Sequence, residues 1–475
     1  MLTVIKFFYM KITVLTASFC LFCFAGLIAF FPSGGGYGID SRGSKIHASQ
    51  NLNDDAFRIA GREESPADVK FGTPGQVCAG VNIHFVTGHE KDLDMIVAAG
   101  FRFIRMDLEW FHTERKRGEY DWTDYDELTA NLEERGLRAL YILGYSNGIY
   151  EEVVSSKVIN GIEWKSLASP QHPESVAAFA KWAAAAADHF KGKDIIWEIW
   201  NEPNIFYWQP RPDVEQYNAL ALATCKAIKA VVPDALIVGP STSQVPLPFL
   251  ESFLASGIME YLDAVSVHPY RYYSKPPETA NWEYEDLRKL IEQYAPEGKK
   301  EMPVISSEWG YPSHTNGVPL GQQAEFIVRM QLSNLLNGIP MSVWYDWKND
   351  GDDPEEREHN FGTVTSDLNP KPAYTAIQTL NMQLKGYTLQ RRLDLENEND
   401  YLLIFRNNKD KFKICAWTMD QAHSVTLANK IPKATLASAT DGTGKSLKLK
   451  IDNEKLILDL TQMPQYIYLP RGIGD

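Results

Sequence analysis

The strongest constraint on the fold of this chain is a regular alternation of helical patterns and short apolar runs between residues 73 and 385. The apolar runs of strand length are "VCAGVNIHF", "FRFIRMDLEW", "LRALYILGYS", "DIIWEIW", "ALIVGPSTS", "DAVSVHPY", "MPVISSEWG" and "MSVWYDW". Strands that alternate with helices are parallel and joined by crossover connections. Eight such units predict an α/β chain folded as a (β/α)8 TIM barrel. No Gly-x-Gly-x-x-Gly motif follows the first run, which disfavours a dinucleotide-binding fold.

The pattern changes on both sides of this barrel. Residues 386–475 hold short alternating runs such as "YLLIFRNN" and "KLILDL", which predict a small antiparallel β-sandwich. Residues 1–31 carry two lysines and then an uncharged run of about 20 residues, long enough to span a bilayer. We therefore expect a signal peptide or membrane anchor and an exported protein, located outside the cytoplasm or anchored facing outward. The polar residues 32–72 predict a flexible linker.

The charge balance argues against a nucleic-acid partner. The chain has 47 Lys and Arg against 61 Asp and Glu, a net charge of −14. It therefore has no excess of basic residues to meet the phosphates of a nucleic acid.

No His or Cys cluster has zinc spacing, and the acidic stretch "NDGDDPEEREHNFG" lacks the spacing of a calcium loop. We expect no nucleic-acid partner, no catalytic metal and no cofactor.

Two glutamates end strands of the predicted barrel. Active sites of such barrels lie at the carboxyl ends of the strands. Glu202 follows the fourth run in "WEIWNEPN", and Glu308 closes the seventh run in "SSEWGYP". Two carboxyls across a pocket suit glycoside hydrolysis, in which one protonates the leaving oxygen and the other attacks or stabilises the anomeric carbon. The other strand-end candidates for the pocket are His84, Arg105, His268, Tyr270, Trp344, Asp346 and Trp347.

The residues around Glu202 have a strand pattern that ends abruptly. Glu198, Trp200 and Glu202 share one parity, which predicts that they face the same way on a pleated strand. Pro203 ends the strand because it has no N–H to give to the ladder. Asn201 can line the pocket together with Glu202 only if the strand ends or bulges there. For Glu198, deeper in the barrel, a structural ion pair is the favoured interpretation.

The two glutamate motifs resemble a known family. "WEIWNEPN" and "SSEWGYP" are similar to the fourth-strand and seventh-strand signatures of the clan A glycoside hydrolases, with families 39 and 5 nearest in character. The resemblance implies that Glu202 is the acid/base and Glu308 the nucleophile of a retaining hydrolase that cleaves β-glycosidic bonds by double displacement. It also implies substrate-binding roles for Arg105, Asn201, His268 or Tyr270, and Trp344.

The residues themselves are consistent with these roles. A guanidinium from Arg105 beside Glu308 would favour the ionised carboxylate that a nucleophile needs. Glu202 must instead stay protonated until substrate arrives, which an apolar aromatic setting favours.

Other pocket residues have open interpretations. His84 could bind a sugar hydroxyl or pack in the barrel, whereas Trp309 and Trp347 are expected as pocket walls. The loop residues 206–208, Phe-Tyr-Trp, are expected to form a sugar platform. A non-catalytic glycan-binding protein on the same scaffold remains the alternative, as does a transglycosylase. Exo or endo action, the identity of the sugar, glycan binding by the C-terminal domain and the oligomeric state stay open.

Overall fold

The computed structural model describes residues 70–159, 162–271, 275–430, 438–453 and 455–469. The export segment expected at residues 1–31, and nearly all of the linker expected at residues 32–72, lie outside these ranges. Both expectations therefore stay predictions. Among the described residues, no helix combines the length and the apolar character that a membrane crossing requires.

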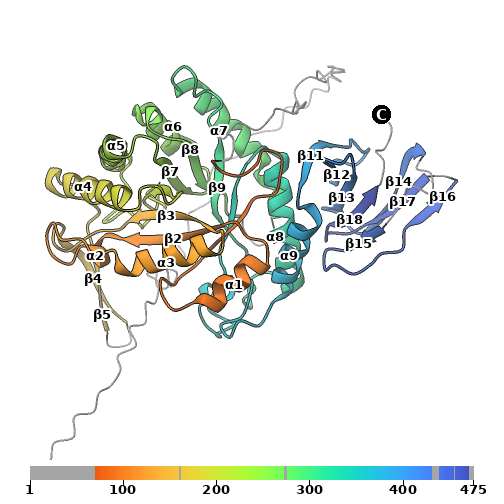
Figure 1. Cartoon of the computed structure of the whole chain (residues 1–475), viewed down its shortest axis with the longest axis horizontal. Helices are drawn as coiled ribbons and strands as arrows, with labels where there is room; N and C mark the ends of the chain where they lie inside the picture. The colour runs from red at the N-terminus through yellow and green to blue at the C-terminus, as the bar shows by residue number, and fades with distance from the viewer. Residues whose placement is uncertain (1–69, 160–161, 272–274, 431–437, 454, 470–475) are drawn as a thin grey trace, which may run out of the picture. The chain divides into compact units, whose positions relative to one another are not determined.

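A closed barrel of eight parallel strands forms the larger part of the described chain (Figure 1). The strand order around the barrel is β1-β10-β9-β8-β7-β6-β3-β2, so every expected strand pairs with two others and the predicted TIM barrel is confirmed. The barrel strands are β1 (Ala79–Asn82), β2 (Phe103–Glu109), β3 (Arg138–Gly144), β6 (Ile196–Ile199), β7 (Leu236–Ser243), β8 (Ala264–His268), β9 (Val304–Trp309) and β10 (Ser342–Trp344).

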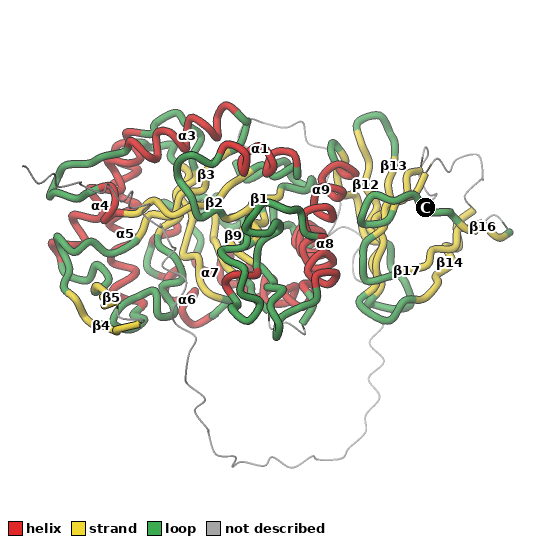
Figure 2. The backbone as a smooth tube through the Cα atoms, turned by 90° about the horizontal axis from the view of Figure 1, so that it is seen from below, coloured by secondary structure: helices red, strands yellow, loops and turns green. Residues whose placement is uncertain are grey.

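Helices surround the strands, as the backbone view shows (Figure 2). Each turns an apolar stripe inward; on α5 this stripe includes Tyr217, Cys225 and Ile228, all fully buried. The α5 helix begins at Asp213, whose carboxylate accepts hydrogen bonds from two backbone N–H groups of the first turn. The helices are α1 (Glu90–Ala98), α2 (Trp110–Thr113), α3 (Thr123–Glu134), α4 (Pro173–His189), α5 (Val214–Val231), α6 (Leu247–Ala255), α7 (Asn281–Tyr294), α8 (Leu320–Leu336) and α9 (Pro372–Leu384), with 3-10 turns η2 (Ile258–Glu260), η3 (Pro277–Ala280) and η4 (Glu358–Asn360).

The barrel interior changes from apolar to charged along the strands. Phe103 and Ile196 belong to a fully apolar cluster that also contains residues from β3, β7, β8, β9 and β10. Arg105 lies two residues after Phe103, and Glu198 two residues after Ile196, each on the same face of its strand. The apolar layer therefore forms a floor beneath a charged layer, which lies toward the carboxyl ends of the strands.

A two-stranded hairpin interrupts the connection after β3. Its strands, β4 (Val153–Ile159) and β5 (Ile162–Leu167), pair with each other and with no barrel strand. This hairpin was not among the predicted elements. The signal was present, because an Asn-Gly pair at 160–161 separates two runs of alternating character.

The C-terminal part forms two antiparallel sheets, which confirms the predicted β-sandwich, and its five-stranded sheet lies next to α8 and α9 (Figure 1). Their shared core contains Leu402, Ile414, Leu458 and Ile467, all at most 1% exposed. The five-stranded sheet is β11 (Tyr387–Arg392), β12 (Asp400–Asn407), β13 (Phe412–Thr418), β18 (Gln465–Leu469) and β15 (Ser438–Thr440); the other is β14 (His423–Lys430), β17 (Lys455–Leu460) and β16 (Lys450–Asp452).

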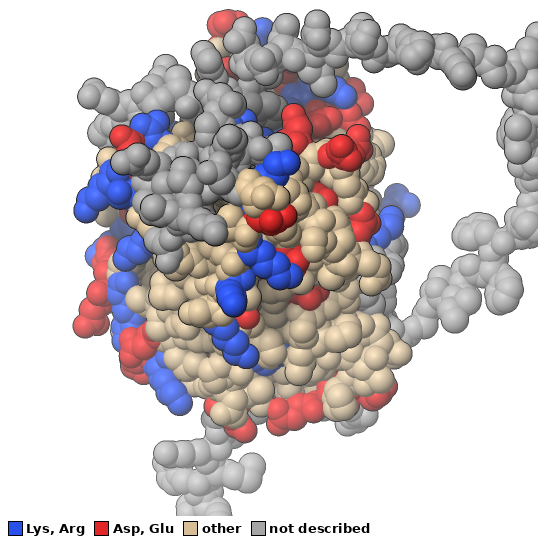
Figure 3. Space-filling model, turned by 90° about the vertical axis from the view of Figure 1, so that its right-hand side faces the viewer, with Lys and Arg blue, Asp and Glu red and all other residues tan. Residues whose placement is uncertain are grey.

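Basic and acidic side chains are interspersed on the face shown in Figure 3, among a larger area of other residues. The described part of that face therefore offers no continuous basic surface of the kind that nucleic acids bind.

A buried hydrogen-bonded group joins the sandwich to the barrel. Arg329 in α8 donates through Nε and Nη2 to the two oxygens of Glu278, at 2.8 Å each, and both residues are at most 4% exposed. Trp417 in β13 donates its indole N–H to the same Glu278 carboxylate at 2.7 Å. Glu278 therefore neutralises a buried cation and also holds the neighbouring domain.

Replacing Glu278 by Ala should destabilise the protein strongly. The change leaves Arg329 as a buried, unpaired charge, and breaking such a pair typically lowers the free energy of unfolding by about 3–5 kcal/mol. Urea unfolding of the variant should show a clearly lower midpoint. The control is Asp286→Ala, which removes the exposed ion pair with Lys289 and should change stability by less than about 1 kcal/mol. Equal effects of the two substitutions would contradict the prediction.

Candidate active site

Arg105 is the centre of a hydrogen-bonded cluster at the carboxyl ends of the barrel strands. Its guanidinium is 1% exposed. It donates from Nε to Glu198 (2.6 Å), from Nη1 to Glu308 (2.5 Å) and from Nη2 to the amide oxygen of Asn201 (2.7 Å). A planar guanidinium with donors in fixed directions can hold three partners at once. The expected contact between Arg105 and Glu308 is therefore present, and Glu198 forms the ion pair favoured for it.

Both oxygens of the Glu308 carboxylate accept hydrogen bonds. Arg105 donates to Oε2, and the Tyr270 hydroxyl donates to Oε1 at 2.7 Å. Two such bonds fix the orientation of the carboxyl group. Glu308 is 9% exposed, at the end of β9. These contacts suit a carboxylate that must attack an electrophilic carbon.

Glu202 lies beyond a strand that ends earlier than the residue pattern predicted. The β6 strand stops at Ile199, and Trp200 and Glu202 adopt left-handed backbone conformations with φ of 67° and 46°. The prediction that Glu198, Trp200 and Glu202 share one strand face is therefore wrong beyond Ile199. Trp200 instead packs in the aromatic core, 5.2 Å from the ring of Trp208.

The left-handed turn is held by contacts with β7. The backbone N–H of Glu202 donates to the carbonyl of Ser241 at 3.0 Å, and the Ser241 hydroxyl donates to the carbonyl of Trp200 at 2.8 Å. Left-handed conformations of non-glycine residues are strained and persist where the surroundings fix them. The turn directs both Asn201 and Glu202 into the site, as the sequence required.

Burial sets the protonation of Glu202. Its carboxyl is 6% exposed, and desolvation raises its pKa to about 7. His268 contacts it through Nδ1, 3.0 Å from Oε1. Burial also lowers the pKa of His268 to about 4, so the ring is neutral. Arg105 Nη2 lies 3.3 Å from His268 Nε2 and can only donate, which places the ring proton on Nδ1, facing Glu202.

The two carboxyls face each other at short range. A carboxylate oxygen of Glu202, one of Glu308 and a ring nitrogen of His268 all lie within 4.8 Å of one another. One carboxyl is held by an arginine and a tyrosine, whereas the other is desolvated beside a neutral imidazole. The site therefore combines a carboxyl that favours its protonated form with one bonded as a carboxylate.

The three predicted tryptophans at the strand ends are buried. Trp309, Trp344 and Trp347 are each at most 1% exposed. Trp344 donates its indole N–H to the carbonyl of Phe361, and Trp347 donates to Asp92. They brace the strand ends, and sugar contacts by them stay a prediction.

The expected aromatic platform after Glu202 is only partly exposed. Trp208 is fully buried and donates to Gln216, so the platform prediction is wrong for this residue. Phe206 is 38% exposed and lies 4.5 Å from the ring of Tyr207. Phe206 can therefore still meet a ligand at the surface, whereas Trp208 belongs to the core.

His84 stands in a neighbouring polar cavity. Its Nδ1 lies 2.9 Å from an oxygen of Asp350 and 3.6 Å from one of Asp346. Asp107 was not among the predicted site residues. It accepts a hydrogen bond from the Tyr145 hydroxyl at 3.1 Å and interacts electrostatically with Arg105, His84 and Glu308. The sequence does indicate this position, because Asp107 lies two residues after Arg105 and alternate residues of a strand face the same side.

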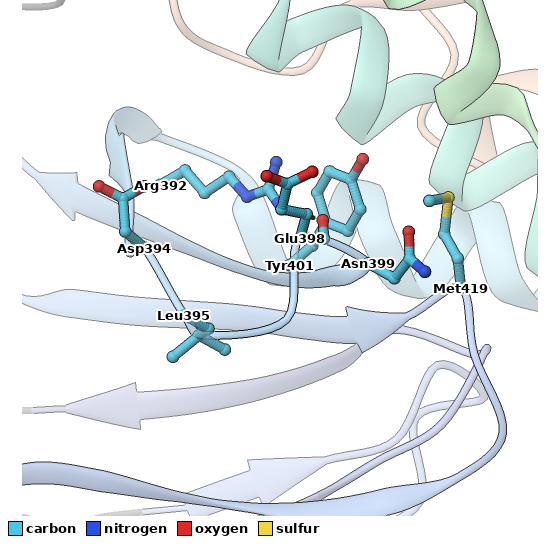
Figure 4. Close-up of a pocket in the computed structure, with 7 residues that line it drawn as sticks. All are labelled: Arg392, Asp394, Leu395, Glu398, Asn399, Tyr401 and Met419. Carbon is cyan, nitrogen blue, oxygen red and sulfur yellow. Dashed lines mark hydrogen bonds between the residues drawn. The ribbon is translucent and has the colours of Figure 1, made fainter. Parts of the chain in front are cut away.

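A separate hollow lies in the sandwich at the ends of β11 and β12 (Figure 4). Tyr401 lines it, but one face of its ring stacks on Trp417 at 4.7 Å and the other lies under the Arg392 guanidinium at 3.8 Å. A ring covered on both faces offers no platform to a sugar. Glycan binding here has no support from this ring.

The comparisons with known proteins agree with the geometry. The family model described as "Cellulase (glycosyl hydrolase family 5)" matches residues 70–351. A family 39 glycoside hydrolase from Bacteroides cellulosilyticus WH2 has 28% sequence identity, a TM-score of 0.71, and coverage of 83% of this chain and 81% of that chain. A family 39 β-xylosidase from Caulobacter crescentus has 19% identity and a TM-score of 0.61, covering 83% of this chain and 96% of that chain, which shows a shared fold.

A curated β-xylosidase from Caldicellulosiruptor saccharolyticus is 24% identical over 248 residues, 46% of this chain and 49% of the relative. The chain therefore spans about half the length of this curated relative.

The Glu202 carboxyl should make stability depend on pH. Because its pKa rises from the usual 4.5 to about 7 on folding, the folded chain binds an extra proton between these values, and stability falls as pH rises through this window. The Glu202→Gln variant lacks this titration. It should gain on the order of 3 kcal/mol relative to the wild type between about pH 4 and about pH 8. Urea unfolding of both proteins measures the gain, and a pH-independent difference would contradict it.

Proposed function

This chain belongs to the cellulase family of glycosyl hydrolases, family 5, and from that membership and its site geometry we propose that it hydrolyses β-glycosidic bonds with retention of configuration. It is a clan A glycoside hydrolase, with Glu202 proposed as the acid/base and Glu308 as the nucleophile. The observation that carries the proposal is the contrast between the two carboxyls. Burial raises the pKa of Glu202 to about 7, whereas Arg105 and Tyr270 donate to Glu308.

In the first step Glu308 attacks the anomeric carbon while Glu202 gives its proton to the leaving oxygen. The glycosidic C–O bond breaks, the aglycone leaves as an alcohol, and a glycosyl ester forms on Glu308. As Glu308 loses its charge, Arg105 remains paired with Glu198, so the cation is never left alone.

In the second step Glu202, now ionised, takes a proton from water. The water oxygen attacks the anomeric carbon and the ester bond to Glu308 breaks, which restores both carboxyls. His268 supports both states of Glu202, since its Nδ1–H donates to a carboxylate oxygen or to the carbonyl oxygen of the acid.

The spacing of the carboxyls supports retention. Retaining glycosidases place the two groups about 5–5.5 Å apart, whereas inverting ones need about 6.5–9.5 Å for a water between them. Oxygens of Glu202 and Glu308 lie within 4.8 Å. This short distance between single oxygens supports the retaining arrangement.

Aryl β-xylosides are the first substrates to test, because two of the similar proteins are named β-xylosidases. A non-catalytic glycan-binding protein is the weaker alternative, since binding alone does not require two carboxyls in opposite environments. A transglycosylase would share the first step and use a sugar hydroxyl in place of water.

Replacing Glu202 and replacing Glu308 should have different effects on hydrolysis. Glu202→Ala should lower kcat/KM by about 10²–10⁴-fold for poor leaving groups, while sparing the first step for dinitrophenyl glycosides, whose phenolate departs unprotonated. Glu308→Ala should lose at least roughly 10⁴-fold on both, because no glycosyl ester can form. Stopped-flow release of the phenolate distinguishes the two cases. Exposed Glu301 serves as the control, and Glu301→Ala should retain full activity.

Azide gives a second readout of the same roles. In Glu202→Ala it should attack the glycosyl ester and yield a β-glycosyl azide, whereas in Glu308→Ala it should replace the nucleophile and yield the α-azide. The opposite pattern, or activity of Glu308→Ala within about tenfold of the parent, would exclude the assignment.

The stereochemical outcome is a separate prediction. Two inversions at the anomeric carbon give net retention, so a β-glycoside should first release the β-anomer of the sugar. Proton NMR during the first minutes, before mutarotation, measures the anomer formed. Initial appearance of the α-anomer would overturn the double displacement even if both glutamates proved essential.

A further inference from the structure

A polar chamber beside the catalytic pair contains buried acceptors without donors. This cavity of about 230 Å³ is lined at the ends of β1 and β10 by Asn82, His84, Asp346 and Asp350, among others. Asn82 is 5% exposed and Asp346 is 1% exposed, yet the Oδ1 atoms of both have no hydrogen-bond partner. Buried acceptors normally have donors, so these oxygens indicate a ligand that supplies them.

The chamber adjoins the catalytic centre. Asn82 pairs in register with Arg105 across β1 and β2, which places it beside the charged layer. Asp107 and Glu358 each interact electrostatically with both His84 and Glu308. A substrate whose anomeric carbon meets Glu308 can therefore extend into the chamber.

Acidic side chains outnumber basic ones among the described groups around the chamber. Asp346 and Asp350 both lie beside His84, and Lys371 is a second cation that interacts electrostatically with Asp346. Lys348 is paired with Asp92, and Lys371 donates to Asn349 and to the carbonyl of Asn360. Asp107 and Glu358 interact electrostatically with His84, and Glu109 interacts with Asp107; Arg357 lies 3.4 Å from Glu358.

Burial, and after it the neighbouring acids, disfavours the charged forms of Asp346 and Glu358. Burial raises the pKa of Glu358 to about 7, and burial together with Asp350 raises that of Asp346. A second anion would face the same lack of compensation.

Building on the proposed glycosidase function, we propose that this chamber selects the substrate by charge, with Asp346 and Asp350 as specificity-determining residues. It takes an uncharged sugar unit, whose hydroxyls donate to the unpartnered oxygens of Asn82 and Asp346. It rejects a sugar that carries a carboxylate or a sulfate, because that group has no proton to donate and meets like charge. A substrate with an added amine is accepted.

Three small polyols of one size test this selection. Glycerol is neutral, glycerate is an anion and 2-amino-1,3-propanediol is a cation, and each fits a chamber for either pentoses or hexoses. Their inhibition constants are measured against the aryl β-glycoside that the full chain cleaves best. Glycerate should inhibit at least about tenfold more weakly than glycerol, because like charges in contact cost several kcal/mol. The amine should inhibit at least as well as glycerol.

Neutralising the chamber should remove the discrimination. Asp350→Asn should bring glycerate within about threefold of glycerol, and Asp346→Asn should act in the same direction. The matched control is Asp367→Asn, an exposed aspartate in the same connection, which should leave the ratio unchanged. In the wild type, about 0.5 M NaCl should strengthen inhibition by glycerate through screening.

Several outcomes would overturn the proposal: equal inhibition by glycerol and glycerate, no inhibition by glycerol, or a ratio that Asp350→Asn does not change. Dialysis against EDTA should have no effect, and a changed ratio would assign the chamber to a cation instead. Failure to cleave any aryl β-glycoside would count against the proposed function alone. The same three polyols can then be ranked by the shift that they cause in the unfolding temperature.

Discussion

The charged fork of Arg105 is the interaction on which the site depends. A guanidinium buried inside a barrel is stable only if its donors are matched, and here Glu198, Asn201 and Glu308 match them. Glu198 and Asn201 come from β6 and the turn after it, and Glu308 comes from β9, so Arg105 in β2 fixes the relative positions of these two strand ends. Glu198 is fully buried and stays with Arg105 throughout the proposed cycle. Glu308 can therefore lose its negative charge on forming the glycosyl ester while Arg105 stays paired with Glu198.

The second constraint is the backbone turn after β6. A regular strand would send Asn201 and Glu202 to opposite faces. Left-handed conformations at Trp200 and Glu202 turn the side chains of Asn201 and Glu202 into the site. Contacts with β7 hold this backbone conformation. The same turn buries Glu202 beside His268, and this burial raises its pKa to about 7. Position and protonation of the acid thus have one structural cause.

Much of this could be predicted from the sequence, because periodicity and strand-end chemistry are local properties. Eight apolar runs indicated the barrel, and Glu202 and Glu308 were placed at the strand ends where the structure has them. Two kinds of feature were not predictable in this way. Burial of Trp208 depends on packing against Trp200 and α5, which a loop position does not reveal. The chamber depends on side chains from β1 and β10, which closure of the barrel brings together across about 260 residues of sequence.

The chamber and the catalytic pair differ in how far the fold itself satisfies their buried polar groups. Around Glu308 every oxygen has a donor, which suits a group that must be ready before the substrate arrives. In the chamber the oxygens of Asn82 and Asp346 lack donors, and an unsatisfied buried acceptor costs about 1–3 kcal/mol. A protein selected for stability alone would fill such a space with apolar side chains. The unsatisfied oxygens are therefore best explained by a ligand whose hydroxyls complete them, so that the same residues that weaken the empty fold strengthen the bound one.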